Sequence, residues 1–413
     1  MKFKTVNMIG LGYIGLPTAA VIASKGVNVI GVDINQNTVD TINRGEIHIV
    51  EPGLEELVKK VVHQGYLRAT TQPEKADAFI VAVPTPFKED YEPNLDYIKA
   101  AAKSIAKVLE KGNLVILEST SPVGVTEKMA EWLAEERPDL TFPQQVGEEA
   151  DVNIAYCPER VLPGKVIREL VENDRIIGGM TPKCTKQATQ LYKIFVEGEC
   201  VSTNARTAEM SKLTENAYRD VNIAFANELS LICDKAGIDV WELISLANRH
   251  PRVNILQPGC GVGGHCIAVD PWFIVNDFPE EAKIIKAARE INDYKPKYVI
   301  SKIEKAVQDI ENPKIACLGL AFKPDIDDLR ESPALQITKK LADKGYEILA
   351  VEPNINILPE IFNSYNNVQL SSLEQALQIS DLIVVLVKHK EFIGLKHMKI
   401  GKFLDFVNIK QGF

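Results

Sequence analysis

The pattern of apolar and polar positions divides the chain into three regions. The first region extends to about residue 200 and alternates short apolar runs with segments of helical periodicity. Val and Ile dominate the runs, which is typical of strands buried on both faces of a parallel sheet. Strands that alternate with helices predict βαβ units and a doubly wound domain. The predicted strands cover residues 5–10, 27–33, 78–84 and 114–119.

The second region contains one long helical pattern. Apolar residues recur every three to five positions from Ala208 to Ile232, which predicts a helix over 206–235 with a length of about 45 Å. Gly237 lies where this helix is expected to end. A second helix is expected over 240–248, and the Pro- and Gly-rich residues 250–271 follow as a functional loop. So long an apolar face suits a connector between domains or a dimer interface.

The third region repeats the α/β alternation from about residue 312. Strands are expected over 314–319, 347–352, 381–387 and 402–407, and helices over 333–344 and 372–379. The prediction is therefore an α/β fold: two Rossmann-like doubly wound domains joined by a long central helix and a small helical domain. The expected domains are residues 1–203, 204–305 and 306–413.

Composition narrows the functional classes. The 413 residues carry a formal net charge of −9, which disfavours a nucleic-acid surface. No apolar run approaches the roughly 20 residues of a membrane span, and no signal peptide is recognisable, so a cytoplasmic protein without membrane contact is expected. Seven scattered cysteines without a CxxC pair indicate reduced thiols and argue against a structural zinc site.

The first predicted strand leads into a glycine-rich turn. Gly10, Gly12 and Gly15 have the GxGxxG spacing that lets a pyrophosphate approach backbone N–H groups at a helix N-terminus. Asp33 ends the next strand, where its carboxylate would accept hydrogen bonds from a ribose diol and repel a 2′-phosphate. The pattern favours NAD over NADP. FAD remains a competing cofactor because it uses the same fingerprint.

Two threonines follow later strands of the same predicted sheet. Thr85 and Thr120 are expected at the carboxyl ends of their strands, where ligands bind in open α/β sheets. Each hydroxyl equally fits a helix N-cap. The spacing alone leaves both interpretations open.

Residues 259–271 contain four glycines in six positions around two cysteines. Cys266 in such a loop is a candidate nucleophile, since a thiol adds to an aldehyde and the adduct can be oxidised to a thioester. A small buried hydrophobic residue is the simpler interpretation. A metal site formed by Cys260, His265 and Cys266 is a third, weakened because adjacent side chains of an extended chain point to opposite sides.

The long helix also carries a polar face. Lys212 and Asn216 lie one turn apart, followed by Arg219 and Asp220, and such a face either is solvated or holds an oxyanion or a water. Further charges occur in loops and suit either a phosphate-bearing ligand or a plain surface: Glu159, Arg160, His250, Arg252, Lys323 and Arg330.

In combination, the motifs of this chain resemble those of the UDP-glucose/GDP-mannose dehydrogenase family. They occur in the same order along the chain as in that family and cover nearly its whole length. They are the GLGYIG turn from Gly10, VPTP from Val83, STSPVG from Ser119, KLTEN from Lys212, GGHC from Gly263, and FK with DLRES up to Ser332. The glucose-specific branch has Pro-Lys-Asp after the cysteine motif, whereas this chain has Ala268-Val-Asp270 and is similar to the N-acetylhexosamine branch. Cys260 stands where the family has Pro.

The resemblance implies an NAD-dependent, four-electron oxidation of a UDP-N-acetylhexosamine at C6. The expected substrate is UDP-N-acetyl-D-mannosamine and the product its uronate, formed through a thiohemiacetal and a thioester for bacterial surface polysaccharide, namely enterobacterial common antigen. UDP-N-acetylglucosamine, UDP-glucose and GDP-mannose are alternative substrates. A two-electron hydroxyacid or 6-phosphogluconate-type dehydrogenase and a non-catalytic nucleotide-binding module are the rival classes.

The resemblance also assigns roles to residues. Cys266 would be the nucleophile and Lys212 the acid/base and oxyanion stabiliser. Asn216 and Asp270 would position water, and Glu159 would act as base in thioester hydrolysis. A homodimer through the central helix is expected, with Arg252 reaching the partner subunit. The expected UDP-sugar contacts are Arg160, Val161, Lys212, Asn216, Arg219, His250, Arg252, Gly263, Lys323 and Arg330. The expected NAD contacts are Gly10, Gly12, Tyr13, Ile14, Gly15, Asp33, Thr85, Thr120 and Thr126, and no metal is expected.

Overall fold

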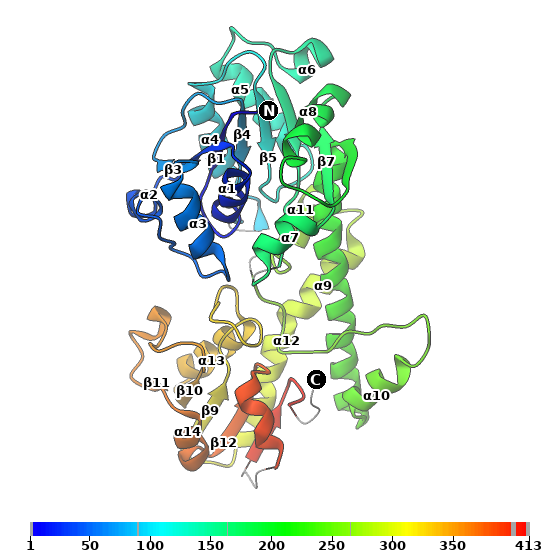
Figure 1. Cartoon of the computed structure of the whole chain (residues 1–413). Coiled ribbons are helices and arrows are strands. Elements are labelled where there is room, and N and C mark those ends of the chain that lie inside the picture. Colours follow the sequence, from blue (N-terminus) through cyan, green and yellow to red (C-terminus); the bar gives the residue numbers. More distant parts are fainter. Residues whose placement is uncertain (1–2, 89–90, 163, 265, 398–401, 410–413) are drawn as a thin grey trace. The chain divides into compact units, whose positions relative to one another are not determined.

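The computed structural model describes residues 3–88, 91–162, 164–264, 266–397 and 402–409. The chain forms two compact units, Met1–Glu215 and Asn216–Phe413. Each unit contains one sheet of largely parallel strands (Figure 1). The predicted boundaries at residues 203 and 305 stay predictions.

The sheet of the first unit has eight strands in the order β3-β2-β1-β4-β5-β6-β7-β8. All neighbouring pairs are parallel except β6 and β7. The first six strands have the doubly wound order, with its switch point between β1 and β4, where ligands of such sheets bind. The strands are β1 (Thr5–Ile9), β2 (Asn28–Val32), β3 (Leu67–Thr70), β4 (Ala78–Val81), β5 (Leu114–Leu117), β6 (Asn153–Tyr156), β7 (Arg175–Gly179) and β8 (Cys200–Asn204).

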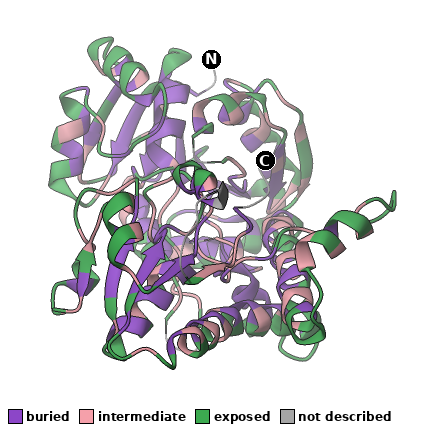
Figure 2. Ribbon diagram, turned by 90° about the horizontal axis from the view of Figure 1, so that it is seen from below, coloured by how far each residue is buried: buried purple, intermediate pink, exposed green. Residues whose placement is uncertain are grey.

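Helices cover both faces of this sheet. Residues of α1, α3, α7 and α8 pack in one apolar core, and residues of α4 and α5 pack in the other. Alternate residues of a strand join different cores, as Ile80 and Val81 of β4 do, which explains the uninterrupted apolar runs. The strands of the sheets are largely buried, as the purple arrows in Figure 2 show. The helices are α1 (Gly15–Ser24), α2 (Gln36–Asn43), α3 (Leu54–His63), α4 (Asp96–Ala106), α5 (Val125–Glu136), α6 (Pro143–Val146), α7 (Val166–Glu172) and α8 (Pro182–Tyr192).

The second unit has a five-stranded parallel sheet in the order β11-β10-β9-β12-β13. Its strands are β9 (Lys314–Leu318), β10 (Glu347–Val351), β11 (Val368–Leu370), β12 (Leu382–Val385) and β13 (Lys402–Asp405). The helices are α10 (Val240–Ala247), α11 (Asp270–Asp277), α12 (Lys283–Val307), α13 (Pro333–Asp343) and α14 (Leu373–Ile379). This doubly wound sheet, together with that of the first unit, confirms the predicted α/β fold.

The long helix α9 (Ala205–Ala236) agrees with the prediction to within one residue at each end. It ends before Gly237, which has a φ of +70° that glycine adopts without strain. Every apolar run predicted as a strand contains one, usually shorter by one to three residues. Among the described residues, no helix combines the length and the apolar character that crossing a membrane requires.

Helix α12 is the main element that the sequence pattern did not predict. It has 25 residues and contains Pro296, which interrupts the helical pattern that periodicity analysis looks for. It also buries Arg289, Asn292 and Lys295. Because polar residues occupy buried positions of this helix, its apolar residues do not recur at the regular helical spacing. The hydropathy pattern therefore does not indicate the helix.

Candidate active site

The glycine turn after β1 has the geometry that the sequence predicts. Gly10 has a φ of +91°, and a Cβ there would lie 2.6 Å from the Ala82 carbonyl oxygen. A Cβ on Gly15 would lie 1.8 Å from the Gly10 carbonyl oxygen. At Gly12, by contrast, a Cβ would meet no atom within 4 Å, so the space beside the turn is open. A pyrophosphate fits this space at the N-terminus of α1.

Asp33 lies directly beside this turn. Its Oδ2 accepts a hydrogen bond from Leu11 N at 3.1 Å, and its Oδ1 accepts one from Asn35 N at 2.9 Å. These two backbone donors fix the carboxylate at the end of β2, where a ribose would lie. Tyr13 is exposed and Ile14 half-buried just before α1. The open cradle and the fixed carboxylate together fit a dinucleotide.

The three threonines expected at the cofactor have different environments. Thr85 donates its hydroxyl hydrogen bond to the Thr120 carbonyl, which links the loops after β4 and β5. Thr126 is fully buried and donates both its N–H, at 2.8 Å, and its hydroxyl, at 2.6 Å, to Glu209 Oε1. Burial raises the pKa of Glu209. The Thr126 hydroxyl is therefore engaged in anchoring α9, and its contact with a cofactor stays a prediction.

A buried group of charged and polar side chains surrounds Glu159. Glu159 Oε2 accepts from Arg175 Nη1 at 2.9 Å, and Oε1 accepts from Arg160 N at 2.5 Å. Glu118 follows β5 and accepts from the Tyr192 hydroxyl at 2.5 Å. Burial, reinforced by the Glu159 carboxylate, raises the pKa of Glu118 to about 7.

The sequence analysis missed Glu118, Arg175 and Tyr192. A signal for Glu118 was present, because a carboxylate directly after a fully apolar strand and directly before a Ser/Thr loop is unusual. Arg175 opens β7 with a side chain that is only 1% exposed. A charge at the edge of an apolar run was the available signal for it.

The loop after β6 is tied to the first half of α9. Arg160 donates to Glu215 through Nε at 3.1 Å and forms an ion pair through Nη2 at 2.8 Å. Val161 is half-buried beside it, and Lys212 is half-buried on the same helix as Glu215. Both charges of the pair are only partly buried, so the ion pair contributes little to the stability of the fold. Its main effect is to orient the loop.

Asn216, Asp270 and Cys266 are brought together in the second unit. Asn216 Nδ2 donates to Asp270 Oδ2 at 2.5 Å, and both residues are buried. Asp270 N and Val269 N both donate to the Cys266 carbonyl oxygen, at 2.8 and 3.0 Å. Cys266 is half-buried at the turn that leads into α11. A half-buried cysteine, whose backbone carbonyl is bonded to the residue that carries this buried carboxylate, suits nucleophilic chemistry.

The glycine-rich segment packs against the loop that precedes α13. A Cβ on Gly263 would lie 2.6 Å from the Glu331 carbonyl oxygen, and Gly264 N donates to the Arg330 carbonyl at 3.1 Å. The same loop carries Lys323, which is exposed, and Arg330, which pairs with Asp328. The predicted substrate residues Gly263, Lys323 and Arg330 therefore belong to one region of the second unit.

The other predicted substrate residues lie on or just after helices. Arg219 is exposed on α9, and His250 and Arg252 are exposed beyond α10. Arg252 N donates to His250 Nδ1 at 3.3 Å, which forms a tight local turn. The structure of each unit by itself does not bring these three cations to the cysteine segment.

The metal interpretation of the cysteine segment gains no support from Cys260. Cys260 is buried, and its thiol donates to the Leu386 carbonyl at 3.4 Å. His265 lies outside the described residues. In the described part of the chain, one group of three potential ligands occurs elsewhere, at Asp325, His389 and Glu391. There His389 Nδ1 already accepts from Asp325 N at 2.9 Å, which occupies its lone pair.

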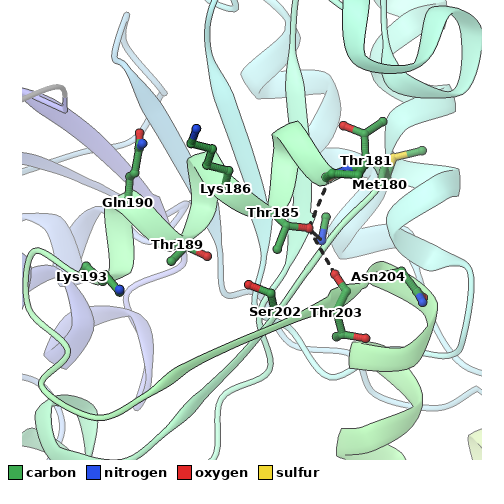
Figure 3. A pocket seen from close by; sticks show the side chains of 12 residues that line it. Met180, Thr181, Thr185, Lys186, Thr189, Gln190, Lys193, Ser202, Thr203 and Asn204 are labelled. Carbon is green, nitrogen blue, oxygen red and sulfur yellow. Dashed lines mark hydrogen bonds between the residues drawn. The ribbon is translucent and has the colours of Figure 1, made fainter.

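A cavity of about 610 Å³ lies along α8 and β8 (Figure 3). Its lining includes Thr185, Lys186, Thr189 and Ser202. None of the predicted site residues lines it. The predicted site is therefore not this cavity.

Comparison with known protein families identifies the family of the chain. The NAD binding domain of the UDP-glucose/GDP-mannose dehydrogenase family matches residues 4–196. The central domain of the same family matches residues 206–294, and its UDP binding domain matches residues 316–411. The chain belongs to the UDP-glucose/GDP-mannose dehydrogenase family. This nucleotide-sugar dehydrogenase is an oxidoreductase with NAD as its cofactor, as the sequence predicts.

Several relatives are similar to this dehydrogenase over nearly its whole length. A UDP-N-acetyl-D-mannosamine dehydrogenase of Campylobacter jejuni is 70% identical over 97% of this chain and 99% of its own. One of Escherichia coli is 65% identical over 95% of both. An NDP-N-acetyl-D-galactosaminuronic acid dehydrogenase of Ralstonia nicotianae is 62% identical over 95% of this chain and 92% of its own.

Solved structures agree with the fold. The UDP-N-acetyl-D-mannosamine dehydrogenase of Pyrococcus horikoshii superposes with a TM-score of 0.87 at 38% identity and covers 99% of this chain and 96% of its own. The native enzyme of this name from Staphylococcus aureus gives 0.86 at 41% identity, with the same coverage. These values confirm the two-sheet architecture with its long connecting helix.

Proposed function

We propose that this dehydrogenase oxidises C6 of UDP-N-acetyl-D-mannosamine to the carboxylate of UDP-N-acetyl-D-mannosaminuronate. The observation that carries the proposal is the 65–70% identity, over nearly the full length, to proteins named for that substrate. The relative named for an N-acetylgalactosaminuronic acid is nearly as similar, at 62%. A UDP-N-acetyl sugar of another configuration is therefore the second candidate substrate.

The cofactor is held by residues of the first unit. Gly10, Gly12 and Gly15 leave room for its pyrophosphate, and Asp33 offers carboxylate oxygens to its ribose. The loops that carry Thr85 and Thr120 lie at the carboxyl ends of β4 and β5, the strands next to the switch point. When bound, NAD accepts hydride, so that a four-electron oxidation yields two NADH per sugar.

Cys266 supplies the covalent step. Its thiol adds to the C6 aldehyde to give a thiohemiacetal, whose oxidation leaves a thioester on the same sulfur. Water then attacks the thioester carbonyl, releases the thiol and forms the carboxylate. The half-buried position of Cys266, at the turn into α11, supports this role because a substrate could not reach a fully enclosed thiol.

The remaining catalytic groups manage protons and charge. Lys212 donates a hydrogen bond to the oxygen on C6 as negative charge develops there. It also acts as the acid/base group that takes up the proton of the C6 hydroxyl. Asn216 and Asp270 orient the attacking water. Glu159 accepts the water proton, and its two oxygens keep a second lone pair each beside the bonds from Arg175 and Arg160.

The substrate diphosphate carries negative charge, which matches the predicted cations. Arg160 is half-buried and pairs with Glu215, Arg330 is exposed and pairs with Asp328, and Lys323 is exposed. Arg219, His250 and Arg252 are exposed and add to the positive charge. Val161 and Gly263 offer apolar and backbone surface to the sugar.

We further propose that the protein is a cytoplasmic homodimer formed through α9 and α10. Tyr218, Phe225 and Ile232 recur every seven residues on α9 and are 69%, 53% and 55% exposed, and Leu246 on α10 is 59% exposed. Seven residues are close to two helical turns, so the three form one apolar stripe. A second copy would bury this stripe.

The product would serve surface polysaccharide synthesis, namely that of enterobacterial common antigen.

A panel of sugar nucleotides tests the proposed reaction. The purified protein is incubated with NAD and limiting UDP-N-acetyl-D-mannosamine, its N-acetylgluco and N-acetylgalacto counterparts, UDP-glucose or GDP-mannose. We expect the mannosamine derivative to have the highest kcat/KM and to yield two NADH per sugar. One NADH per sugar would instead place the chain with two-electron dehydrogenases, and an absence of turnover with all five would favour a binding module.

A further inference from the structure

The glycine-rich segment that carries Cys266 is attached at both ends to one face of α9. At its start, Gly259 N donates to Asn227 Oδ1 at 2.9 Å. At its end, Asn216 Nδ2 donates to Asp270 Oδ2 at 2.5 Å. Asn216 and Asn227 are eleven residues apart, close to three full turns, so their side chains leave the helix on the same side. Both are buried.

The orientation of the Asn227 amide is fixed by α12. Asn227 Nδ2 donates to Asn292 Oδ1 at 2.8 Å, and Asn292 Nδ2 in turn donates to Asp220 Oδ1, also at 2.8 Å. Arg289 pairs with the same Asp220 oxygen at 2.7 Å. A flipped Asn227 amide would place donor against donor at Gly259 and acceptor against acceptor at Asn292. The network therefore leaves Asn227 one orientation, with its oxygen toward Gly259.

Residues 261–264 of the segment have little room to move. A Cβ on Gly261 would lie 3.2 Å from the Asn292 carbonyl oxygen, and one on Gly263 would lie 2.7 Å from Phe322 Cβ. Gly264 has a φ of +83° and packs against the Phe322 ring. In such close packing, a displacement at Gly259 is passed along the backbone rather than absorbed. Cys266 lies seven residues beyond Gly259.

We propose that Asn227 is a positioning residue, which sets the place of the Cys266 sulfur through its hydrogen bond to Gly259. The inference rests on the proposed role of Cys266. Asn227 lies too deep in the second unit to contact solvent, and its effect passes through the backbone of the segment. A reacting atom displaced by about 1 Å costs on the order of 10²-fold in rate.

Two variants separate positioning from plain stability. Asn227→Leu keeps the size of the side chain but removes the bonds to both Gly259 and Asn292. The matched control Ser230→Ala lies three residues along α9. It removes the Lys295 hydrogen bond between the same two helices and the bond from the Ser230 hydroxyl to the Asn227 carbonyl oxygen, but no bond to the segment. We expect both to lower Tm. Asn227→Leu should lower kcat by about 10²-fold with KM for the sugar nucleotide changed less than about 3-fold, whereas Ser230→Ala keeps kcat within about 3-fold.

A second readout needs neither cofactor nor sugar. The rate of iodoacetamide alkylation is measured from pH 6 to 9 by mass spectrometry of the peptide that contains Cys266. We expect Asn227→Leu to change the rate or its pH midpoint and Ser230→Ala to match the unsubstituted protein. If Asn227→Leu does not fold, Asn227→Ala takes its place.

The outcomes distinguish this inference from the proposed function. Equal kcat and equal alkylation profiles for Asn227→Leu and Ser230→Ala would overturn the positioning role. If the unsubstituted protein oxidised none of the sugar nucleotides, the proposed function would fail, yet the alkylation comparison would still decide whether Asn227 places the Cys266 sulfur.

Discussion

Cys266 and Glu118 illustrate how the environment of a single side chain decides its chemistry. Cys266 is half-buried at a turn, whereas Cys157, Cys260 and Cys317 are fully enclosed, and burial raises the pKa of each of those three thiols. A thiol that must be both reached by substrate and deprotonated cannot be enclosed in that way. The same kind of burial raises the pKa of the Glu118 carboxyl to about 7.

Replacement of the nucleophile is the most direct test of the covalent step. Cys266→Ser removes the thiol but keeps a small polar side chain, so thioester formation should stop and steady-state turnover should fall on the order of 10³-fold or more. Oxidation of the alcohol to the aldehyde should be partly retained, which releases the first NADH. The measurement is NADH release together with mass spectrometry of the protein for a covalent adduct. Unchanged turnover to two NADH per sugar would rule the covalent route out.

Glu118 gives a pH dependence of stability. Its pKa is about 7 in the folded protein against 4.5 in the unfolded chain, so between these values the folded state holds a proton that the unfolded state has lost. This carboxyl therefore contributes stability that is full below about pH 4.5 and is lost as pH rises to about 7.

Glu118→Gln tests this assignment. The amide keeps an oxygen acceptor for the Tyr192 hydroxyl and does not titrate. We expect the free energy of unfolding of this variant to fall less between pH 5 and 7.5 than that of the unsubstituted protein, as measured by urea titration at several pH values. Parallel pH profiles for the two proteins would contradict the raised pKa.

The elements show which local features specify the site and which do not. The strand–turn–helix unit around Gly10 could be predicted because each glycine meets a steric requirement that is encoded within a few residues. The loop 259–264 could be recognised as special from its composition, but its attachment to Asn227 depends on a residue more than thirty positions away. Helix α12 could not be predicted at all, since Pro296 and its buried polar residues obscure the helical period.

The two glycines at the N-terminus of α1 should respond differently to alanine. A methyl group on Gly15 meets the Gly10 carbonyl oxygen, so Gly15→Ala should destabilise the fold by about 1–3 kcal/mol or more. A methyl group on Gly12 enters open space, so Gly12→Ala should keep Tm but raise KM for NAD by about tenfold or more. Calorimetry and NAD titrations check the pair. Equal loss of Tm in both variants would contradict an open cradle at Gly12.

For the molecule as a whole, the net charge affects substrate binding and the exposed apolar surface affects assembly. A chain with a net charge of −9 binds an anionic sugar nucleotide only where cations are concentrated. The apolar stripe on α9 lies on the outside of the second unit, where water would otherwise cover it. Large exposed apolar patches of this kind mark interfaces.

A charge in the middle of the stripe tests the proposed dimer. Phe225→Glu places a carboxylate where two copies would pack, so we expect the protein to dissociate to monomers at micromolar concentration. Arg219→Glu changes a charge on the same helix away from the stripe and serves as the control for assembly. Analytical ultracentrifugation distinguishes the two variants. A dimer that persists in Phe225→Glu would remove α9 from the interface.

Sequence and tertiary structure determined different parts of this protein. The sequence by itself determined the α/β alternation, the long helix, the nucleotide turn, the family and the identity of the candidate nucleophile, because each depends on local periodicity or on short motifs. Only the tertiary structure revealed that Arg175 pairs with Glu159 and Tyr192 bonds Glu118, that Thr126 anchors Glu209, and that Asn227 holds the cysteine segment. These contacts join residues far apart in the chain, and burial and hydrogen-bond geometry decide them rather than any pattern along the sequence.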